Sequence, residues 1–364
     1  MAMELYRTSV KRFFMIFFSL SIILLFTFVL SLSIGSTVVN PVDVFIKLVY
    51  NFIYTMLDIF GIPHSPIGFG ADKIYNIAML RLGRTVASVL TGSLLGVAGL
   101  LIQTVTRNPL AEPYILGLSS TALTAIAIGI IIAPNIIVHR WTLMTIAFIG
   151  SLLGFTLTLV LSRLAGGTSI SLVLAGIAVN ALFSGVSHTL LYSIQKIIKI
   201  HYVFLLMGST STILLGDTIL LLAPSLTGIT VALLMFKMLN AFIYGDEYAK
   251  QLGYNPSIVL IITSTIVSIL TASTVAVIGI VGFIGLAAPH ISRLLVGTDH
   301  RFSIPVVAVI GAVVTTIADI IVRIISLLSA GLGELPLGVI TSTIGAPFLA
   351  YLIIKRMKSY EDSY

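Results

Sequence analysis

The sequence has no cysteine and little charge. Among its 364 residues, 9% are charged and 58% are hydrophobic, whereas soluble globular chains carry about 25% charged residues. A chain of this composition cannot cover a water-exposed surface, so we expect a bilayer around it, with about 20 apolar residues in each spanning helix. The absence of cysteine excludes disulfides, thiolate metal sites and cysteine nucleophiles, and it leaves the redox compartment undetermined.

Motifs for phosphate binding and catalysis are missing as well. No lysine follows a glycine, so a Walker A loop cannot occur. The sequence has no HExxH motif and no dinucleotide-binding fingerprint, and its six histidines are scattered without ligand spacing. We therefore expect no metal site in this chain, and if transport uses ATP, another subunit must supply the phosphate-binding site.

Acidic groups are scarce at membrane depth. Of the 13 acidic residues, only Asp319 lies deep inside an apparent span, four residues before Arg323. This spacing predicts an ion pair on one helix, and a proton relay built on Asp319 is the less favoured alternative. Ion-coupled transporters need ionisable groups inside the membrane, so the scarcity argues against a secondary transporter, an intramembrane protease and a redox membrane enzyme.

Apolar runs divide the chain into ten expected spans. They cover residues 13–34, 82–105, 114–133, 141–162, 170–194, 215–238, 256–278, 279–296, 303–328 and 335–354. Residues 35–80 are expected to form an external segment with an interfacial helix near 42–60, and residues 195–210 a short amphipathic stretch. The predicted class is an all-α, polytopic membrane protein of about ten helices, with a single transmembrane domain over residues 1–364 and core spans over 82–356.

Positive charges around the spans indicate the orientation. Arg7, Lys11 and Arg12 precede the first apolar run, which is longer than the core of a signal peptide. We therefore expect a retained span with the N-terminus in the cytoplasm. Ten spans then place both termini inside, with 12 of the 20 lysines and arginines in cytoplasmic segments, a modest bias in the expected direction.

A polar segment at residues 240–254 interrupts the spans on the expected cytoplasmic side. Asp246 and Glu247 stand where a helix N-terminus favours acids, and a glycine and a proline follow the segment. The pattern predicts a short helix with Tyr248 and Leu252 on one face, because they are four residues apart. Such a helix between two spans is a candidate lever for a partner protein, and an ordinary interfacial connector is the alternative.

Short motifs in a shared order run through nearly the whole chain from residue 81 to residue 355. They are Arg81-Leu-Gly-Arg84, Asn108-Pro-Leu-Ala-Glu-Pro113, Leu174-Ala-Gly176, Gly245 to Gly253, Phe283-Ile-Gly-Leu with Pro289-His290, Thr298-Asp-His-Arg301, Ala318-Asp319 with Arg323, Glu334-Leu-Pro-Leu-Gly-Val339 and Gly345-Ala-Pro347. Each motif is weak alone. Their set and spacing resemble the FecCD-type permeases of type II ABC importers, which take up iron-siderophore complexes, haem and cobalamin.

The resemblance implies a pair of permease subunits around a central path, either identical or close paralogues, in the cytoplasmic membrane of a prokaryote. It implies two cytoplasmic ATPase subunits that hold ATP and magnesium, so that this chain is not itself an enzyme, and an extracytoplasmic binding protein that delivers the cargo. The expected cargo is an iron chelate or a cobalamin-like molecule. An oxyanion such as molybdate, carried by the same family, is the alternative, and an ion-coupled secondary transporter is less favoured.

The resemblance also implies roles for particular residues. The segment 245–253 matches the coupling helix that sits in a cleft of the ATPase, with contacts expected from Asp246, Glu247, Tyr248, Ala249, Gln251, Leu252 and Gly253. Arg81, Arg84 and Arg323 match arginines of the outer mouth that meet acidic side chains of the binding protein; internal pairing or contact with lipid phosphates is the alternative. Gly83 replaces a proline that is frequent in relatives, so we expect a more flexible turn there.

Two proline-containing segments are candidates for gating. The first holds Asn108, Pro109, Glu112 and Pro113, a stiff loop for which gating and a simple tight turn are equally supported. The second holds Pro289 and His290. Pro289 is expected to kink its span or end the upper half, and His290 to be a packed or hydrogen-bonded group rather than a metal ligand.

Overall fold

The computed structural model describes residues 2–35, 37–61, 73–198, 208–329 and 334–361, and every regular element in these ranges is helical. The helices are α1 (Ala2–Ser33), α2 (Pro41–Ile59), α3 (Lys73–Thr106), α4 (Leu118–Ile132), α5 (Arg140–Leu164), α6 (Ser169–Ile198), α8 (Ile219–Leu234), α9 (Phe236–Ile243), α10 (Asp246–Gln251), α11 (Pro256–Val277), α12 (Ile284–Val296), α13 (His300–Leu328) and α14 (Leu337–Glu361), with 3-10 turns η2 (Pro113–Leu116), η3 (Pro134–Val138) and η4 (Leu215–Thr218). Seven segments are long and apolar enough to span a membrane, and shorter apolar helices in α4, α12 and α14 complete the ten expected spans within these ranges.

The central helix of the bundle is α3, which packs against α13, α11 and α12. Glycines let the backbones approach closely. Gly92 lies against Gly311 of α13, and Gly99 lies against Gly285 of α12, and neither contact leaves room for a β-carbon. Because lipid is as apolar as the helices, close packing of this kind is a main source of helix association in a membrane.

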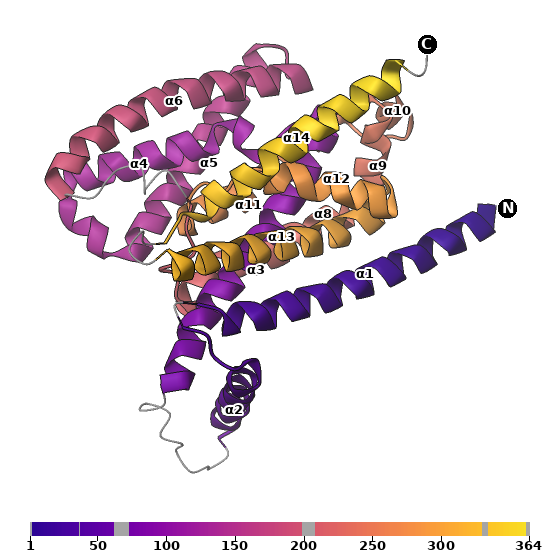
Figure 1. The fold of residues 1–364 in the computed structure, drawn as a ribbon. Helices are drawn as coiled ribbons and strands as arrows, with labels where there is room; N and C mark the ends of the chain where they lie inside the picture. Colours follow the sequence, from indigo (N-terminus) through magenta and orange to yellow (C-terminus); the bar gives the residue numbers. More distant parts are fainter. Residues whose placement is uncertain (1, 36, 62–72, 199–207, 330–333, 362–364) are drawn as a thin grey trace.

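The two ends of the bundle carry different elements. The start of α1, the end of α14 and the short α10 lie at one end, and α2 lies at the other (Figure 1). We name these the inner and the outer end, after the predicted orientation. The segments expected inside and outside the cell therefore lie at opposite ends.

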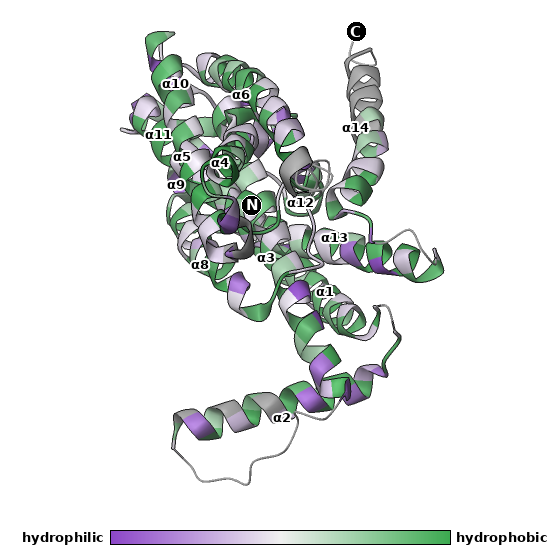
Figure 2. Ribbon diagram, turned by 90° about the vertical axis from the view of Figure 1, so that its left-hand side faces the viewer, coloured by the Kyte–Doolittle hydropathy of each residue, from purple (hydrophilic) through white to green (hydrophobic). Residues whose placement is uncertain are grey.

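The predicted interfacial helix is α2, which runs across the direction of α1. Figure 1 shows α1 at length and α2 foreshortened, and Figure 2 shows the reverse. Asn40 caps α2 by accepting a hydrogen bond from the Val42 N–H at 3.0 Å. Val44 is buried against α1 and α3, whereas Phe45 and Phe52 are exposed, as in a helix that lies at a lipid surface.

Several span boundaries differ from the sequence prediction for local reasons. The second span begins at Lys73, so α3 extends well beyond the apolar run that predicted it. The third begins at Leu118, because Gly117 ends η2 in a left-handed conformation with φ 78. The eighth begins only at Ile284, after Phe283 with φ 69, and the sixth is divided into α8 and α9.

Two further elements complete the fold. The expected amphipathic stretch at 195–210 begins as the last turn of α6, and its residues 199–207 lie outside the described ranges. α14 packs chiefly on α13 and α12, and Figure 1 shows it along one side of the bundle.

Candidate functional site

The short helix α10 stands at the inner end between two glycines. Gly245 (φ 114) precedes it and Gly253 (φ 83) follows it, both in conformations that favour glycine. Asp246 and Glu247 occupy its first turn and Lys250 its last, the charge order that suits the helix dipole. Lys250 Nζ donates a hydrogen bond to Glu247 Oε1 at 2.8 Å, and this bond raises the pKa of Lys250. The local signals in the sequence thus do form a helix.

The exposed face of α10 is apolar and aromatic. Tyr248 and Leu252 are 45% and 53% exposed, and the Tyr244 ring lies edge-on to the Tyr248 ring at 5.4 Å between centroids. These side chains line a shallow groove of about 350 Å³ together with Lys237, Asn240, Ala241 and Tyr254. Gln251 and Gly253 are also exposed. Ala249, by contrast, is fully buried, so it anchors the helix on the bundle.

A charged contact ties α10 to the end of α3. Arg107 forms an ion pair with Asp246, and the two side chains are 38% and 49% exposed. The Arg107 guanidinium also lies 5.1 Å from the centre of the Phe242 ring in α9. An exposed ion pair contributes only about 0–1 kcal/mol to stability. Its main effect is therefore geometric, because it fixes the position of α10 relative to α3.

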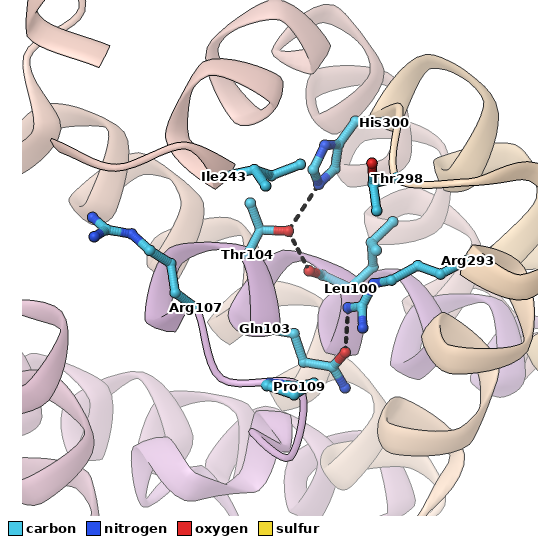
Figure 3. A pocket seen from close by; sticks show the side chains of 9 residues that line it. All are labelled: Leu100, Gln103, Thr104, Arg107, Pro109, Ile243, Arg293, Thr298 and His300. Carbon is cyan, nitrogen blue, oxygen red and sulfur yellow. Dashed lines mark hydrogen bonds between the residues drawn. The ribbon is translucent and has the colours of Figure 1, made fainter. Parts of the chain in front are cut away.

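A cavity of about 200 Å³ with several polar side chains in its lining lies where α3, α9, α12 and α13 meet at the inner end (Figure 3). His300 Nε2 lies 2.8 Å from Thr104 Oγ1, and His300 Nδ1 lies 2.8 Å from Asn240 Oδ1. Asn240 Nδ2 donates to Asp299 Oδ1 at 2.9 Å, and Asp299 caps α13 by accepting from the Arg301 N–H. Burial alone would raise the pKa of Asp299, but these hydrogen bonds and the Arg301 charge outweigh it and lower that pKa. The network joins α9 firmly to α13.

Residues 107–113 hold the first set of gating candidates and are fixed at both ends. Asn108 Oδ1 accepts from a backbone N–H two residues later at 3.0 Å, and Pro109 lines the cavity. Glu112 Oε1 accepts from the Phe283 N–H at 2.7 Å. Burial raises the pKa of Glu112, and this hydrogen bond offsets the rise only in part.

The second gating segment lies inside α12, and the helix continues through Pro289. Pro289 has no N–H for the carbonyl of Gly285, four residues earlier, and Gln103 Nε2 donates to that carbonyl instead at 3.2 Å. The helix therefore does not end at the proline. The His290 ring packs edge-on against Phe348 at 6.0 Å, and no group of three metal-ligating side chains lies together in the described ranges.

At the outer end, Asp319 is the centre of an ion-pair cluster. Its carboxylate is fully buried and accepts from Arg84 Nε at 2.9 Å and from Thr210 Oγ1 at 2.6 Å. It also forms an ion pair with Arg323, and Arg84 Nη1 reaches Glu334 at 2.7 Å. The ion pair predicted from the spacing of Asp319 and Arg323 is present. It belongs to a larger cluster that joins α3 and α13 to Glu334, shortly before the start of α14.

Arg81 completes this outer cluster through backbone carbonyls. Its guanidinium donates to the Ser33 carbonyl at 2.8 Å and to the Thr37 carbonyl at 2.5 Å. Arg81 and Arg84 are each 8% exposed and Arg323 is 2% exposed. The three guanidinium groups predicted to meet a binding protein are thus engaged within the chain, beside an outer cavity of about 270 Å³.

Gly83 is not the flexible turn that the sequence suggested. It lies within α3, and a β-carbon there would come within 2.5 Å of the Leu215 nitrogen. Glycine therefore permits η4 to approach α3. The expectation of a looser presentation of Arg81 and Arg84 is wrong, because a continuous helix holds both residues.

Several residues of these clusters were not assigned roles from the sequence. Gln103 is the one amide side chain in the apolar run 82–105, and a strongly polar side chain in a span usually has a partner or a function. His300 and Glu334 occur inside the quoted motifs, but nothing local indicates their partners. Asn240 and Thr210 stand at segment ends, where polar residues are common.

Known proteins resemble this chain over most of its length. The profile of the FecCD transport family matches residues 23–355. The Fe(3+)-citrate import system permease protein YfmD of Bacillus subtilis is 32% identical over 349 residues, which are 96% of this chain and 97% of that protein. The hemin transport system permease protein HmuU of Yersinia pestis is 35% identical over 78% of this chain and 85% of its own length. The iron(3+)-hydroxamate import system permease protein FhuB of Bacillus subtilis is 37% identical, over 75% and 70% respectively.

A solved structure has a similar fold. It is an inward-facing conformation of a metal-chelate type ABC transporter, 26% identical in sequence, with a TM-score of 0.74 over 94% of this chain and 99% of that chain.

Proposed function

The chain belongs to the FecCD transport family and is a permease subunit of an ABC importer, and from this premise we propose that its cargo is an iron chelate, such as a ferric siderophore or haem, or a cobalamin-like molecule. The observation that carries this proposal is the family match over residues 23–355, together with relatives named for iron(3+)-hydroxamate, Fe(3+)-citrate and hemin. An oxyanion such as molybdate is the second candidate within the family.

Coupling to ATP hydrolysis is proposed to occur at α10. The exposed Tyr248 and Leu252 give this helix an apolar face of the kind found at the centre of protein interfaces. The buried Ala249 and the ion pair of Asp246 with Arg107 hold the helix against the bundle. A displacement of α10 by a bound partner would therefore also displace the helices on which it packs.

ATP and magnesium are proposed to bind a separate ATPase, and this chain is proposed to have no catalytic residue and no cofactor of its own. The absence of a Walker A loop from the sequence supports this division. The complete importer would contain a second permease, identical or closely related, two ATPase subunits and a binding protein. Residues 1–364 would act as one permease domain in a prokaryotic cytoplasmic membrane, with α10 and both termini in the cytoplasm.

At the outer end we propose that Arg81 and Arg84 receive acidic side chains of the binding protein. The cluster of three arginines with Asp319 and Glu334 carries one excess positive charge, since the remaining members are neutral. The Glu334 side chain is 34% exposed, so it can yield Arg84 to an incoming carboxylate. Arg323 is nearly inaccessible, and its proposed role is to hold Asp319 in place.

Alternating access is the proposed transport mechanism. The loop with Asn108, Pro109, Glu112 and Pro113 would gate the inner end, because it joins α10 to the start of α12. Pro289 and His290 are proposed to contribute through the packing of His290 on Phe348 of α14. A secondary transporter is disfavoured, since the one carboxylate deep in a predicted span, Asp319, is neutralised by arginines.

The cargo can be tested directly in proteoliposomes. They would contain this permease and the ATPase encoded beside it, with the neighbouring binding protein added outside together with a ⁵⁵Fe-labelled ferric siderophore. We expect ATP-dependent accumulation of ⁵⁵Fe, or of labelled haem or cobalamin supplied in its place, and an excess of the same unlabelled compound should suppress it. Accumulation of labelled molybdate instead would replace the iron-chelate proposal by the oxyanion one, and uptake without ATP would overturn both.

A further inference from the structure

Two residues other than glycine adopt a positive φ within the described ranges, Arg107 with φ 49 and Phe283 with φ 69. A left-handed conformation is unfavourable for a side chain with a β-carbon, and it persists only where the surroundings hold it. The two residues are distant in the sequence. In the structure Arg107 begins a connection formed by residues 107–113, which we name the inner link, and Phe283 is bonded to the other end of this link through Glu112.

The first end of the inner link is fastened to α9 and α10. Arg107 pairs with Asp246 of α10 and lies over the Phe242 ring of α9. Both contacts come from the strained residue itself. A displacement of α10 therefore acts on the inner link at the point where it leaves α3.

The second end is fastened to the start of α12. Glu112 Oε1 accepts from the N–H of the strained Phe283 at 2.7 Å, and the Tyr114 hydroxyl accepts from the Val281 N–H at 3.1 Å. The Pro113 ring packs on Gly285, where no β-carbon would fit. The backbone before α12 is thus held by side chains of the inner link and of η2.

Gln103 fastens the middle of this arrangement. Its Nε2 donates both to the Ala111 carbonyl of the link at 3.3 Å and to the Gly285 carbonyl of α12 at 3.2 Å. Arg293 of α12 in turn donates to Gln103 Oε1, as Figure 3 shows. The link and the start of α12 are therefore cross-connected through one side chain of α3, which favours their movement as one body.

Phe283 carries the connection on to α14. Its ring lies against Gly345 and leaves no space for a β-carbon there. α14 packs chiefly on α13 and α12, and this contact joins it to the residue just before α12. A shift of Phe283 would press directly on the α14 backbone.

We propose that the inner link, through Glu112 and Phe283, transmits the movement of α10 to α14 during the transport cycle. This inference rests on the proposed function of α10 as the contact with the ATPase. Glu112 is a positioning residue in this account, since it acts on Phe283 and not on cargo. The strained conformations mark the two points where force enters and leaves the link.

The absence of cysteine from the chain allows a clean test in the assembled importer. A single cysteine is introduced by Ala346→Cys at a position of α14 that the rest of the chain leaves uncovered, and its rate of reaction with a membrane-permeant maleimide is measured without nucleotide and after trapping with ATP and vanadate. ATP hydrolysis is measured in the same proteoliposomes. In the otherwise unchanged chain we expect the two states to differ in labelling rate.

Two variants break the link at opposite ends, and two serve as controls. Glu112→Ala removes the acceptor of the Phe283 N–H, and Arg107→Gly removes the ion pair while keeping a residue that tolerates positive φ. Both should lose the difference in labelling rate, and ATP hydrolysis measured beside it shows whether the ATPase still engages α10. Glu112→Gln keeps an acceptor oxygen and should keep the difference, as should Asp43→Ala, which removes an exposed carboxylate of α2.

The outcomes separate the link from the proposed function. If both disconnecting variants keep the difference, the link is overturned while the function of α10 stands. If the unchanged chain shows no difference, there is no movement of α14 to transmit and the link is also overturned; stimulation of ATP hydrolysis by the permease then decides whether the proposed function survives. If Glu112→Gln behaves as Glu112→Ala, the hydrogen bond to Phe283 is not the connection.

Discussion

Replacing Asp319 by asparagine tests whether its carboxylate holds the outer cluster together. The side chain is fully buried and pairs with Arg84 and Arg323. Asparagine keeps the size but leaves two buried guanidinium groups without their shared anion. Breaking a buried ion pair in this way costs about 3–5 kcal/mol, and a chain of this size loses about 2 °C in melting temperature per kcal/mol. We therefore expect the melting temperature of the purified permease in detergent to fall by about 6–10 °C.

Two variants show whether this loss comes from the unpaired charges. Asp43→Asn removes an exposed carboxylate in the first turn of α2 and should change stability by no more than about 0.5 kcal/mol. Adding Arg323→Met to Asp319→Asn removes one of the unpaired cations, while Arg84 keeps Glu334, and should recover much of the loss. The reasoning is refuted if Asp319→Asn melts within about 2 °C of the wild type, or if the double variant melts lower than Asp319→Asn alone.

Three other perturbations test separate parts of the structure by thermal melting. Asp299→Ala removes the cap of α13 and should lower the free energy of unfolding by about 1 kcal/mol at neutral pH. Because the pKa of Asp299 is lowered in the folded chain, this loss of stability should fade as the pH falls through that lowered pKa. A loss that does not depend on pH would contradict the prediction. Glu112 has a raised pKa in the folded chain, so its stabilising contribution is complete below its unfolded pKa and is lost as the pH rises through the folded pKa. The melting temperature of Glu112→Gln should therefore rise relative to that of the wild type as the pH rises. A difference in melting temperature that stays constant with pH would refute this. Gly83→Ala would place a β-carbon against Leu215 and should lower the free energy of unfolding by about 1–3 kcal/mol. Gly185 has open space around it, so Gly185→Ala should be neutral or stabilise by up to about 1 kcal/mol. Equal melting temperatures of the two variants would contradict the packing argument.

The spans were predictable because each is a continuous apolar run, and run length is encoded locally. The boundaries that differ depend on contacts between distant segments. Arg81 binds carbonyls at the end of α1, which favours the extension of α3 beyond its apolar run. Phe283 delays the start of α12 because its N–H is held by Glu112. No pattern within either segment contains that information.

The candidate sites divide in the same way. The helix α10 was predicted from its own acids and glycines, and the pair of Asp319 with Arg323 from their spacing on one helix. The addition of Arg84 and Glu334 to that pair requires the packing of α3 on α13 and the position of the segment before α14. The orientation of Ala249 toward the bundle likewise depends on how α10 docks.

The central claim is that α10 couples ATP hydrolysis by a partner to transport through this chain. Its most direct test measures ATP hydrolysis and cargo uptake together in proteoliposomes that contain the neighbouring ATPase and binding protein, comparing the wild type with a chain carrying Glu247→Lys and Leu252→Asp. Both substituted side chains are exposed, so the variant should fold and still bind the loaded binding protein. We predict that it loses stimulated hydrolysis and uptake together. Uptake and stimulation equal to the wild type would contradict the assignment of α10, and an ATPase that neither associates with the wild-type chain nor responds to it would contradict the importer itself.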